Sequence, residues 1–277
     1  MHYGTMQSVL KADIGATCQL AASLGYQSVE LDWNAAADAL PGGRMSPSMR
    51  DMILKNAAMN DITIASVAAH FLNAGNIASS SPAVVAGAMR DIRRGIQLCA
   101  DIGARVLLVP FFYAADIIGQ AGLERLTRNL RVLAPDAAAA GVVLGVESTL
   151  SAADNLAVMQ AVGSPAGGVY WDMANGMAVG YDPVADARAL AAVIVQVHAK
   201  EFVRDGGPVG TRSQPRFDKL NAAALGYGDV PLTEILAALR SGGYAGHVIC
   251  ETGTFGAVRD SATADLAALR TAGKNNR

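Results

Sequence analysis

The chain has 277 residues, a formal net charge of −2, and 52 % hydrophobic against 17 % charged residues. This composition supplies a large core, and the near-neutral charge argues against nucleic acid as the main partner, because proteins that bind phosphate backbones usually carry a basic surface. No apolar run approaches the roughly 20 residues that span a bilayer, so no membrane partner is expected. Cys18, Cys99 and Cys250 have unrelated spacings, and MHYGTMQSVLKAD lacks a signal-peptide pattern. Both features predict a reducing, cytoplasmic location.

Short apolar runs alternate with longer helical stretches along the whole chain. The runs are rich in Val, Ile and Leu, as expected of parallel strands that are covered on both faces. The predicted strands are Tyr3–Gln7, Ser28–Asp32, Ile62–Ala69, Val106–Pro110, Val142–Glu147, Val169–Asp172, Ile194–His198 and Val248–Glu251. Between the strands, apolar residues recur at the spacing of one helix face.

Residues that typically end helices recur before most of the predicted strands. A glycine ends most predicted helices just before the next strand, as at Gly25, Gly103 and Gly141. This unit recurs eight times without a change of composition, and a (β/α)8 barrel typically takes about 250 residues. The sequence therefore predicts one α/β domain over residues 1–277, a single (β/α)8 TIM barrel. A doubly wound open sheet is the alternative, but no GxGxxG or GxxxxGK[ST] turn follows any strand.

One stretch interrupts the repeat after the seventh strand. Residues 203–228, VRDGGPVGTRSQPRFDKLNAAALGYG, are rich in Gly and Pro and carry several basic side chains. Barrel active sites are built on this face, so the stretch is predicted to be a long loop that binds or covers a ligand.

Each of the last four predicted strands ends in a residue that can bind a metal. The runs are GVVLGVE ending at Glu147, GVYWD ending at Asp172, VIVQVH ending at His198, and GHVIC followed by Glu251. A single strand-end carboxylate is often a helix cap, and a single buried histidine is often a core residue. Four such groups at one barrel mouth, on strands about 4.8 Å apart, instead predict a shared divalent cation. Three carboxylates and an imidazole suit Mn²⁺, Mg²⁺, Co²⁺ or Zn²⁺, and the lack of a thiolate argues against a structural zinc.

Several segments resemble a known family. GVVLGVE, VYWDMANGMAVGYDPV, VHAKEF and LGYGDVPLTEILAALRSGGYAGHVICE resemble the sugar phosphate isomerase/epimerase superfamily, the xylose isomerase-like TIM barrels, and SLGYQSVEL and DIGARVLLV extend the likeness more loosely. The resemblance implies that Glu147, Asp172, His198 and Glu251 hold a divalent metal, with Mn²⁺ the first expectation. It also implies a reaction on a small sugar or related polyhydroxy carbonyl compound.

The same resemblance implies a mechanism. The metal polarises a carbonyl and stabilises an enediolate, while Glu147 and Glu251 remove and return a proton. An isomerase or epimerase is the leading interpretation, and a dehydratase of a keto-inositol or a dehydroshikimate-like acid is the alternative. An AP endonuclease is less favoured, because the fourth strand ends in Val109-Pro110-Phe111-Phe112 without a histidine. A non-catalytic accessory barrel is the remaining hypothesis.

Five further side chains are candidate substrate contacts. They follow predicted strand ends or share an inward face, and they are Trp33, His70, Asn175, Lys200 and Arg204. Ketose 3-epimerases of the family resemble this chain at Arg204 but carry a histidine where Asn175 stands, which argues against a simple ketose 3-epimerase. Each candidate also has a plain structural interpretation, such as packing for Trp33 or an internal salt bridge for Lys200.

Two further expectations come from the resemblance. Glu30 resembles the family's second-strand glutamate, which orients the histidine ligand. Barrels of this type often form dimers or tetramers, so a homo-oligomer is expected by analogy.

Overall fold

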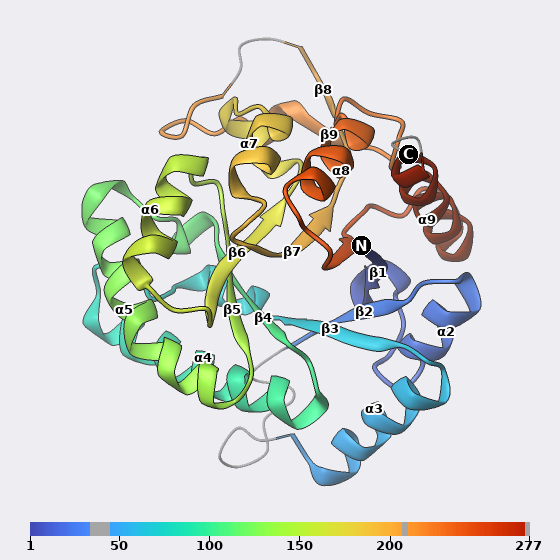
Figure 1. Ribbon diagram of the computed structural model, residues 1–277, viewed down its shortest axis with the longest axis horizontal. Helices are drawn as coiled ribbons and strands as arrows, with labels where there is room; N and C mark the ends of the chain where they lie inside the picture. Colours follow the sequence, from blue (N-terminus) through green and yellow to red (C-terminus); the bar gives the residue numbers. More distant parts are fainter. Residues whose placement is uncertain (34–44, 207–209, 275–277) are drawn as a thin grey trace.

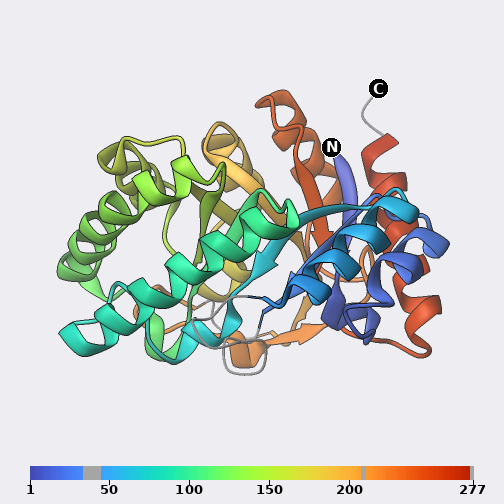
Figure 2. The ribbon, with the colours of Figure 1, turned by 90° about the horizontal axis from the view of Figure 1, so that it is seen from below.

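Eight parallel strands form a closed barrel with helices around its outside (Figure 1 and Figure 2). The structure is a computed structural model that describes residues 1–33, 45–206 and 210–274. The barrel strands are β1 His2–Met6, β2 Ser28–Asp32, β3 Thr63–Ala68, β4 Val106–Phe111, β5 Val143–Ser148, β6 Gly167–Asp172, β7 Ile194–Ala199 and β10 His247–Cys250. Each pairs with the next barrel strand along the chain, and β10 closes the ring beside β1. The predicted (β/α)8 TIM barrel is confirmed, with strand ends shifted by one or two residues from those expected.

The helices cover the outer face of the barrel. The α-helices are α1 Gln7–Leu10, α2 Thr17–Leu24, α3 Pro47–Met59, α4 Pro82–Ile102, α5 Gly119–Ala139, α6 Ala152–Val162, α7 Pro183–Leu190, α8 Leu232–Ser241 and α9 Val258–Lys274. Short 3₁₀ turns are η1 His70–Ala74, η2 Tyr113–Ala115, η3 Asn175–Val179 and η4 Phe217–Lys219. Capping residues start several helices: the Asp182 carboxylate accepts the backbone N–H groups of Val184 and Ala185, with Pro183 in the first turn. Within the described ranges, no helix is long and apolar enough to cross a membrane.

Two apolar clusters and one polar network fill the molecule. The large cluster joins the outward faces of the strands to the helices, and a smaller one lies inside the barrel. The inner cluster consists of Met6, Val9, Ala65, Ala68, Val106, Leu108, Tyr170 and Ile249. Buried polar side chains of β2, β3 and β7 lie beside it: Glu30, Ser66, Gln196 and His198. The barrel interior therefore contains buried polar groups as well as apolar ones.

Close strand contacts inside the barrel make one glycine necessary. A Cβ added at Gly168 on β6 would overlap the Val195 side chain and lie 3.1 Å from the Val193 carbonyl oxygen. We expect Gly168→Ala to lower the free energy of unfolding by about 1–3 kcal/mol, the usual cost of overpacking. Urea denaturation measures the change. Gly87→Ala on α4, where the nearest atom is 3.8 Å away, is the matched control and should be neutral or slightly stabilising. Equal stability of the two variants would contradict the expected overlap.

The stretch after β7 is more ordered than predicted. Residues 203–228 were expected to be a loop, but β8 Phe202–Arg204 and β9 Leu220–Ala222 form an antiparallel hairpin around η4. The residues from 207 to 209, part of that prediction, lie outside the described ranges. In the sequence the Gly and Pro content obscured these short strands, which lie on the same side of the barrel as the functional residues below.

Candidate metal centre and active site

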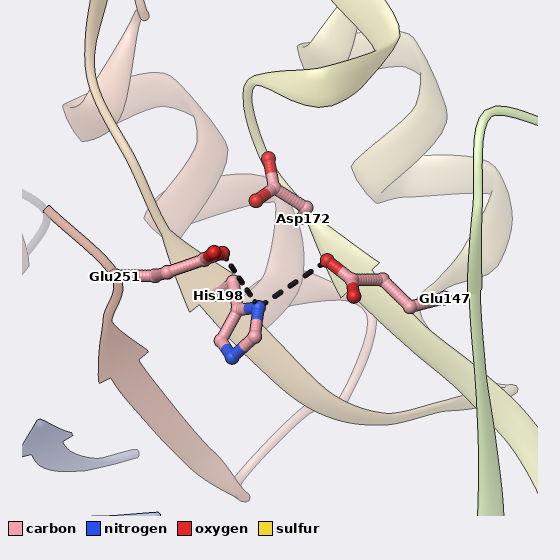
Figure 3. A group of neighbouring side chains, drawn as sticks. All are labelled: Glu147, Asp172, His198 and Glu251. Carbon is pink, nitrogen blue, oxygen red and sulfur yellow. Dashed lines mark hydrogen bonds and ion pairs between the residues drawn. The ribbon is translucent and has the colours of Figure 1, made fainter. Parts of the chain in front are cut away.

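Four side chains meet at the carboxyl ends of β5, β6, β7 and β10. Glu147 and Asp172 lie in β5 and β6, His198 lies in β7, and Glu251 follows the last residue of β10. Each offers a ligand atom, and these atoms all lie within 4.8 Å of one another. Figure 3 shows the two glutamates approaching His198 from opposite sides, with Asp172 above them. The structure therefore brings together the four predicted ligands.

His198 is held by both of its ring nitrogens. Nδ1 faces the cluster, 3.3 Å from a Glu147 oxygen and 2.9 Å from a Glu251 oxygen. Nε2 lies 2.9 Å from Glu30 Oε1, and the other Glu30 oxygen accepts hydrogen bonds of 2.6 Å from both Ser66 and Tyr170. Metal-binding histidines usually donate their second N–H to a carboxylate in this manner. Glu30 therefore fixes the ring so that Nδ1 points at the other side chains of the cluster.

The charge of Glu30 is stabilised in spite of full burial. Burial favours the neutral acid, but His198 and the hydroxyls of Ser66 and Tyr170 outweigh it, and the pKa of Glu30 lies below its ordinary value. Gln196 completes the network by hydrogen bonding to Ser66 and Tyr170. The carboxylate is thus a permanent acceptor for the imidazole.

Glu30→Gln should weaken metal binding. The amide has one acceptor oxygen in place of two, so it cannot accept from His198 Nε2 and from the Ser66 and Tyr170 hydroxyls at the same time. The network that fixes the His198 ring would therefore be broken. Loss of such a partner typically costs about 10–100-fold in metal affinity, and Mn²⁺ titration by calorimetry would measure it. Gln27→Glu, at an exposed position one residue before β2, is the control for a carboxamide–carboxylate exchange. Unchanged affinity in Glu30→Gln would contradict the orienting role.

Lys200 lies between two of the carboxylates. Its Nζ is 3.1 Å from Asp172 Oδ2 and 2.7 Å from Glu251 Oε2, although neither oxygen has a hydrogen bond of good geometry. Burial alone would lower the pKa of Lys200, but Asp172 and Glu251 outweigh it and raise the pKa above its ordinary value. Asp172 Oδ1 instead accepts the backbone N–H groups of Ala174 and Asn175, at 2.8 and 2.7 Å.

The cluster fits a divalent cation. Asp172 Oδ2 and Glu251 Oε2 are buried and have no well-formed hydrogen bond. They share the single ammonium group of Lys200, so part of the negative charge of the three carboxylates is left for a further cation to compensate. His198 Nδ1 faces the same space. The oxygen and imidazole donors are the set that Mn²⁺, Mg²⁺, Co²⁺ and Zn²⁺ accept.

The two glutamates experience different electrostatic surroundings. Burial raises the pKa of Glu147 above its ordinary value, opposed by His198. Burial acts in the same direction on Glu251, but Lys200 and His198 outweigh it and hold the pKa of Glu251 well below its ordinary value. The two carboxyl groups are therefore inequivalent although they face the same histidine.

A cavity of about 320 Å³ opens above the cluster. Its polar lining includes both glutamates, and its apolar lining is aromatic. The lining residues are His70, Asn73, Phe112, Tyr113, Glu147, Asn175, Lys200, Phe202, Phe217 and Glu251. A cavity of this size, with convergent polar groups, is typical of a small-molecule site.

Three of the five predicted substrate contacts lie at this cavity: His70, Asn175 and Lys200. Trp33 does not line this cavity. Its indole is buried and packs edge-on against Phe71, with the ring centroids 5.1 Å apart. Arg204 lines a different cavity, beside Tyr181 and Asp229. The sequence placed both residues after strand ends but did not reveal the direction of the chain beyond them.

Comparison with known proteins decides the family. The family described as xylose isomerase-like TIM barrel matches residues 18–272. The chain belongs to this family. Its resemblance, seen first in the strand-end segments, thus extends over nearly all of the chain.

Family members and solved structures similar to the chain include sugar epimerases. A 2-epi-5-epi-valiolone 7-phosphate 2-epimerase of Actinoplanes sp. is 28 % identical over 197 residues, which cover 70 % of each chain. A xylose isomerase domain protein from Planctomyces limnophilus has a TM-score of 0.77 at 18 % identity, covering 99 % of this chain and 96 % of that one. D-Psicose 3-epimerase with D-tagatose, from Clostridium cellulolyticum H10, has a TM-score of 0.76 at 18 % identity over 99 % of each chain.

Several residues at the site of this family member were not predicted as functional. The network residues Ser66, Tyr170 and Gln196 lie below the ligands, and Asn73, Phe202 and Phe217 line the cavity. Ser66 and Gln196 are polar residues within apolar strand runs, which was the only signal available in the sequence.

An ion pair ties the chain beyond β8 to the opposite side of the mouth. Arg212 contacts both Asp116 oxygens, at 2.8 and 2.5 Å, and also donates to the Ile117 carbonyl. The backbone N–H of Arg216 donates to the Ala178 carbonyl at 2.8 Å. These contacts connect the stretch after β7 to the segments after β4 and β6. Phe217, which belongs to this stretch, lines the cavity as a result.

Proposed function

We propose that the chain is a divalent-metal-dependent isomerase or epimerase of a small sugar, ketose or related polyhydroxy carbonyl compound. The observation that carries the proposal is the pair Glu147 and Glu251, on opposite sides of His198, at the floor of a sugar-sized cavity. Glu147, Asp172, His198 and Glu251 would hold the cation, with Mn²⁺ as the first candidate.

The two glutamates carry the proton in the proposed reaction. A bound cation supplies Lewis acidity at the substrate carbonyl oxygen, which makes the neighbouring C–H more acidic. One glutamate removes that proton from carbon and the other delivers a proton, to the opposite face of the same carbon in an epimerisation or to the adjacent carbon in an isomerisation. Their positions on opposite sides of the cluster suit transfer between two faces.

The remaining cavity residues would bind and orient the substrate. Lys200 and Asn175 can donate hydrogen bonds to substrate oxygens, and His70 faces the same space. Phe112 and Phe217 offer apolar surface for the carbon face of a sugar and exclude water from the reacting carbon. Trp33, which packs against Phe71, and Arg204, which lines a different cavity, are left out of this assignment.

The relatives support the same class of reaction. The curated relative is named as a 2-epimerase, and one similar structure is a ketose 3-epimerase that holds D-tagatose. Both names describe rearrangement at carbon atoms of sugar-like molecules. A homo-oligomer, by analogy with the family, and a cytoplasmic location, from the unpaired cysteines, remain part of the proposal.

Isotope exchange tests the proposed function. The Mn²⁺-loaded protein is incubated in D₂O with a panel of ketoses and cyclic polyhydroxy ketones, and proton NMR follows the carbons next to the carbonyl. Deuterium incorporation that is lost on chelation and restored by Mn²⁺ supports the isomerase or epimerase. Incorporation with loss of water would instead indicate the dehydratase, and exchange equal to that of protein-free Mn²⁺ solution would contradict both.

A further inference from the structure

A second cavity adjoins the one above the metal ligands. It has a volume of about 520 Å³ and shares Lys200, Phe202 and Glu251 with the first. Its other walls come from the segments after β1, β7 and β10 and from the end of β9. They contribute Ser8, Val9, Lys11, Glu201, Ala222, Thr252, Gly253 and Thr254. A ligand at the glutamate pair can therefore extend past Lys200 toward β1.

The far side of this second cavity carries unused hydrogen-bond donors. In the described part of the chain, Lys11 has no ion pair, and the backbone N–H groups of residues 252, 253 and 254 have no acceptor. Lys11 has a left-handed backbone, φ 49°, with its N–H bonded to the Ser8 carbonyl at 3.2 Å. A lysine beside successive free amides is a setting that suits an anion.

The nearby carboxylates are already engaged. Glu201 is buried, and its two oxygens accept backbone N–H groups of Phe202, Gly226 and Val230. Glu251 lies against Lys200 and His198. Asp32, behind Ser8, accepts the Ser8 N–H at 2.8 Å. Lys11, which lines the cavity, therefore has no carboxylate partner of its own among the described residues.

The position also matches a general property of the barrel. In (β/α)8 enzymes, phosphate groups often bind to the segments after the seventh and eighth strands. Here those segments follow β7 and β10, and they supply Lys200 and residues 252–254 to the second cavity.

We propose that this second cavity binds a phosphate monoester at the far end of the substrate, with Lys11 and the amides of residues 252–254 as the donors. The proposal rests on the proposed function, because it takes the other end of the substrate to lie at Glu147 and Glu251. It narrows the substrate class to sugar phosphates or phosphorylated cyclic polyols, in which the phosphate fixes the distance between the reacting carbon and the anion.

Calorimetric titration with inorganic phosphate, at constant ionic strength, tests the subsite in the Mn²⁺-loaded protein. Wild type should bind phosphate, and Lys11→Met should weaken binding at least about tenfold, since a charge-assisted hydrogen bond contributes enough to produce that ratio. Lys11→Arg should largely retain binding. Lys55→Met, which removes the same charge from the exposed face of α3, should bind as wild type does.

The outcomes separate the two proposals. Absence of phosphate binding, or equal affinities of wild type and Lys11→Met, overturns the subsite and leaves the isotope-exchange result untouched. Phosphate binding that depends on Lys11, in a protein that exchanges protons of neither free nor phosphorylated ketones, would support the subsite while contradicting the proposed reaction. Circular dichroism of Lys11→Met checks that the fold is intact, which is expected of an exposed side chain.

Discussion

Glu251→Gln should reduce turnover by about 10²–10⁴-fold, the range over which a general acid or base contributes. The amide keeps the shape of the side chain but can neither remove a proton from carbon nor carry the negative charge that faces His198 and Lys200. The loss should appear in kcat as well as kcat/KM, because the interaction acts on the chemical step. The isotope-exchange rate at saturating substrate and Mn²⁺ measures it.

A matched variant separates the loss of chemistry from a general effect of charge. Glu234→Gln makes the same change on the exposed side of α8 and should turn over as wild type does. Glu147→Gln should resemble Glu251→Gln, because both glutamates face His198 Nδ1. Activity of Glu251→Gln within about twofold of wild type would exclude this carboxylate as a proton carrier, since an acid or base contributes far more.

The barrel and the cluster of four candidate ligands were predictable because their signals are local. Parallel strands buried on both faces require continuous apolar runs, and a charged residue at the end of such a run is conspicuous. Glu147, Asp172 and His198 lie in neighbouring strands of the barrel, so knowledge of the strand order was enough to bring them together.

The residues that complete the site were less predictable because their positions depend on tertiary packing. Ser66 and Tyr170 belong to different strands and meet only at Glu30. Phe217 reaches the cavity because the stretch after β8 is tied to Asp116 across the mouth. Nothing local in the sequence fixes such a path, and for the same reason Arg204, on β8, was expected at the mouth but lies elsewhere.

Lys200 can serve both as an internal salt bridge and as a contact to the substrate. As the internal salt bridge considered from the sequence, it balances Asp172 and Glu251. It also lines both cavities, so the same ammonium can reach substrate oxygens. The negative charge of the three carboxylates exceeds the positive charge that Lys200 alone supplies. Binding of a metal cation would offset this excess and should therefore stabilise the fold.

Mn²⁺ added to chelator-treated protein should raise the melting temperature by about 5–10 °C at 100 times its dissociation constant, since such binding adds about 2.7 kcal/mol and each kcal/mol shifts a chain of this size by about 2–4 °C. Asp172→Asn should abolish most of that shift. Its Oδ1 can still accept the N–H groups of Ala174 and Asn175, so the turn after β6 is retained while the charge is lost. Differential scanning calorimetry with and without Mn²⁺ measures both proteins.

Asp182→Asn provides the control because that residue is also a capping aspartate, bonded to Val184 and Ala185 at the start of α7, but lies outside the ligand cluster. It should keep the full Mn²⁺ shift. If Asp172→Asn and Asp182→Asn respond equally to Mn²⁺, the cation binds elsewhere and the ligand assignment is wrong. A shift that Asp172→Asn alone loses would tie the stabilisation to the carboxylate oxygen that faces Lys200, and with it to the cluster between the two glutamates.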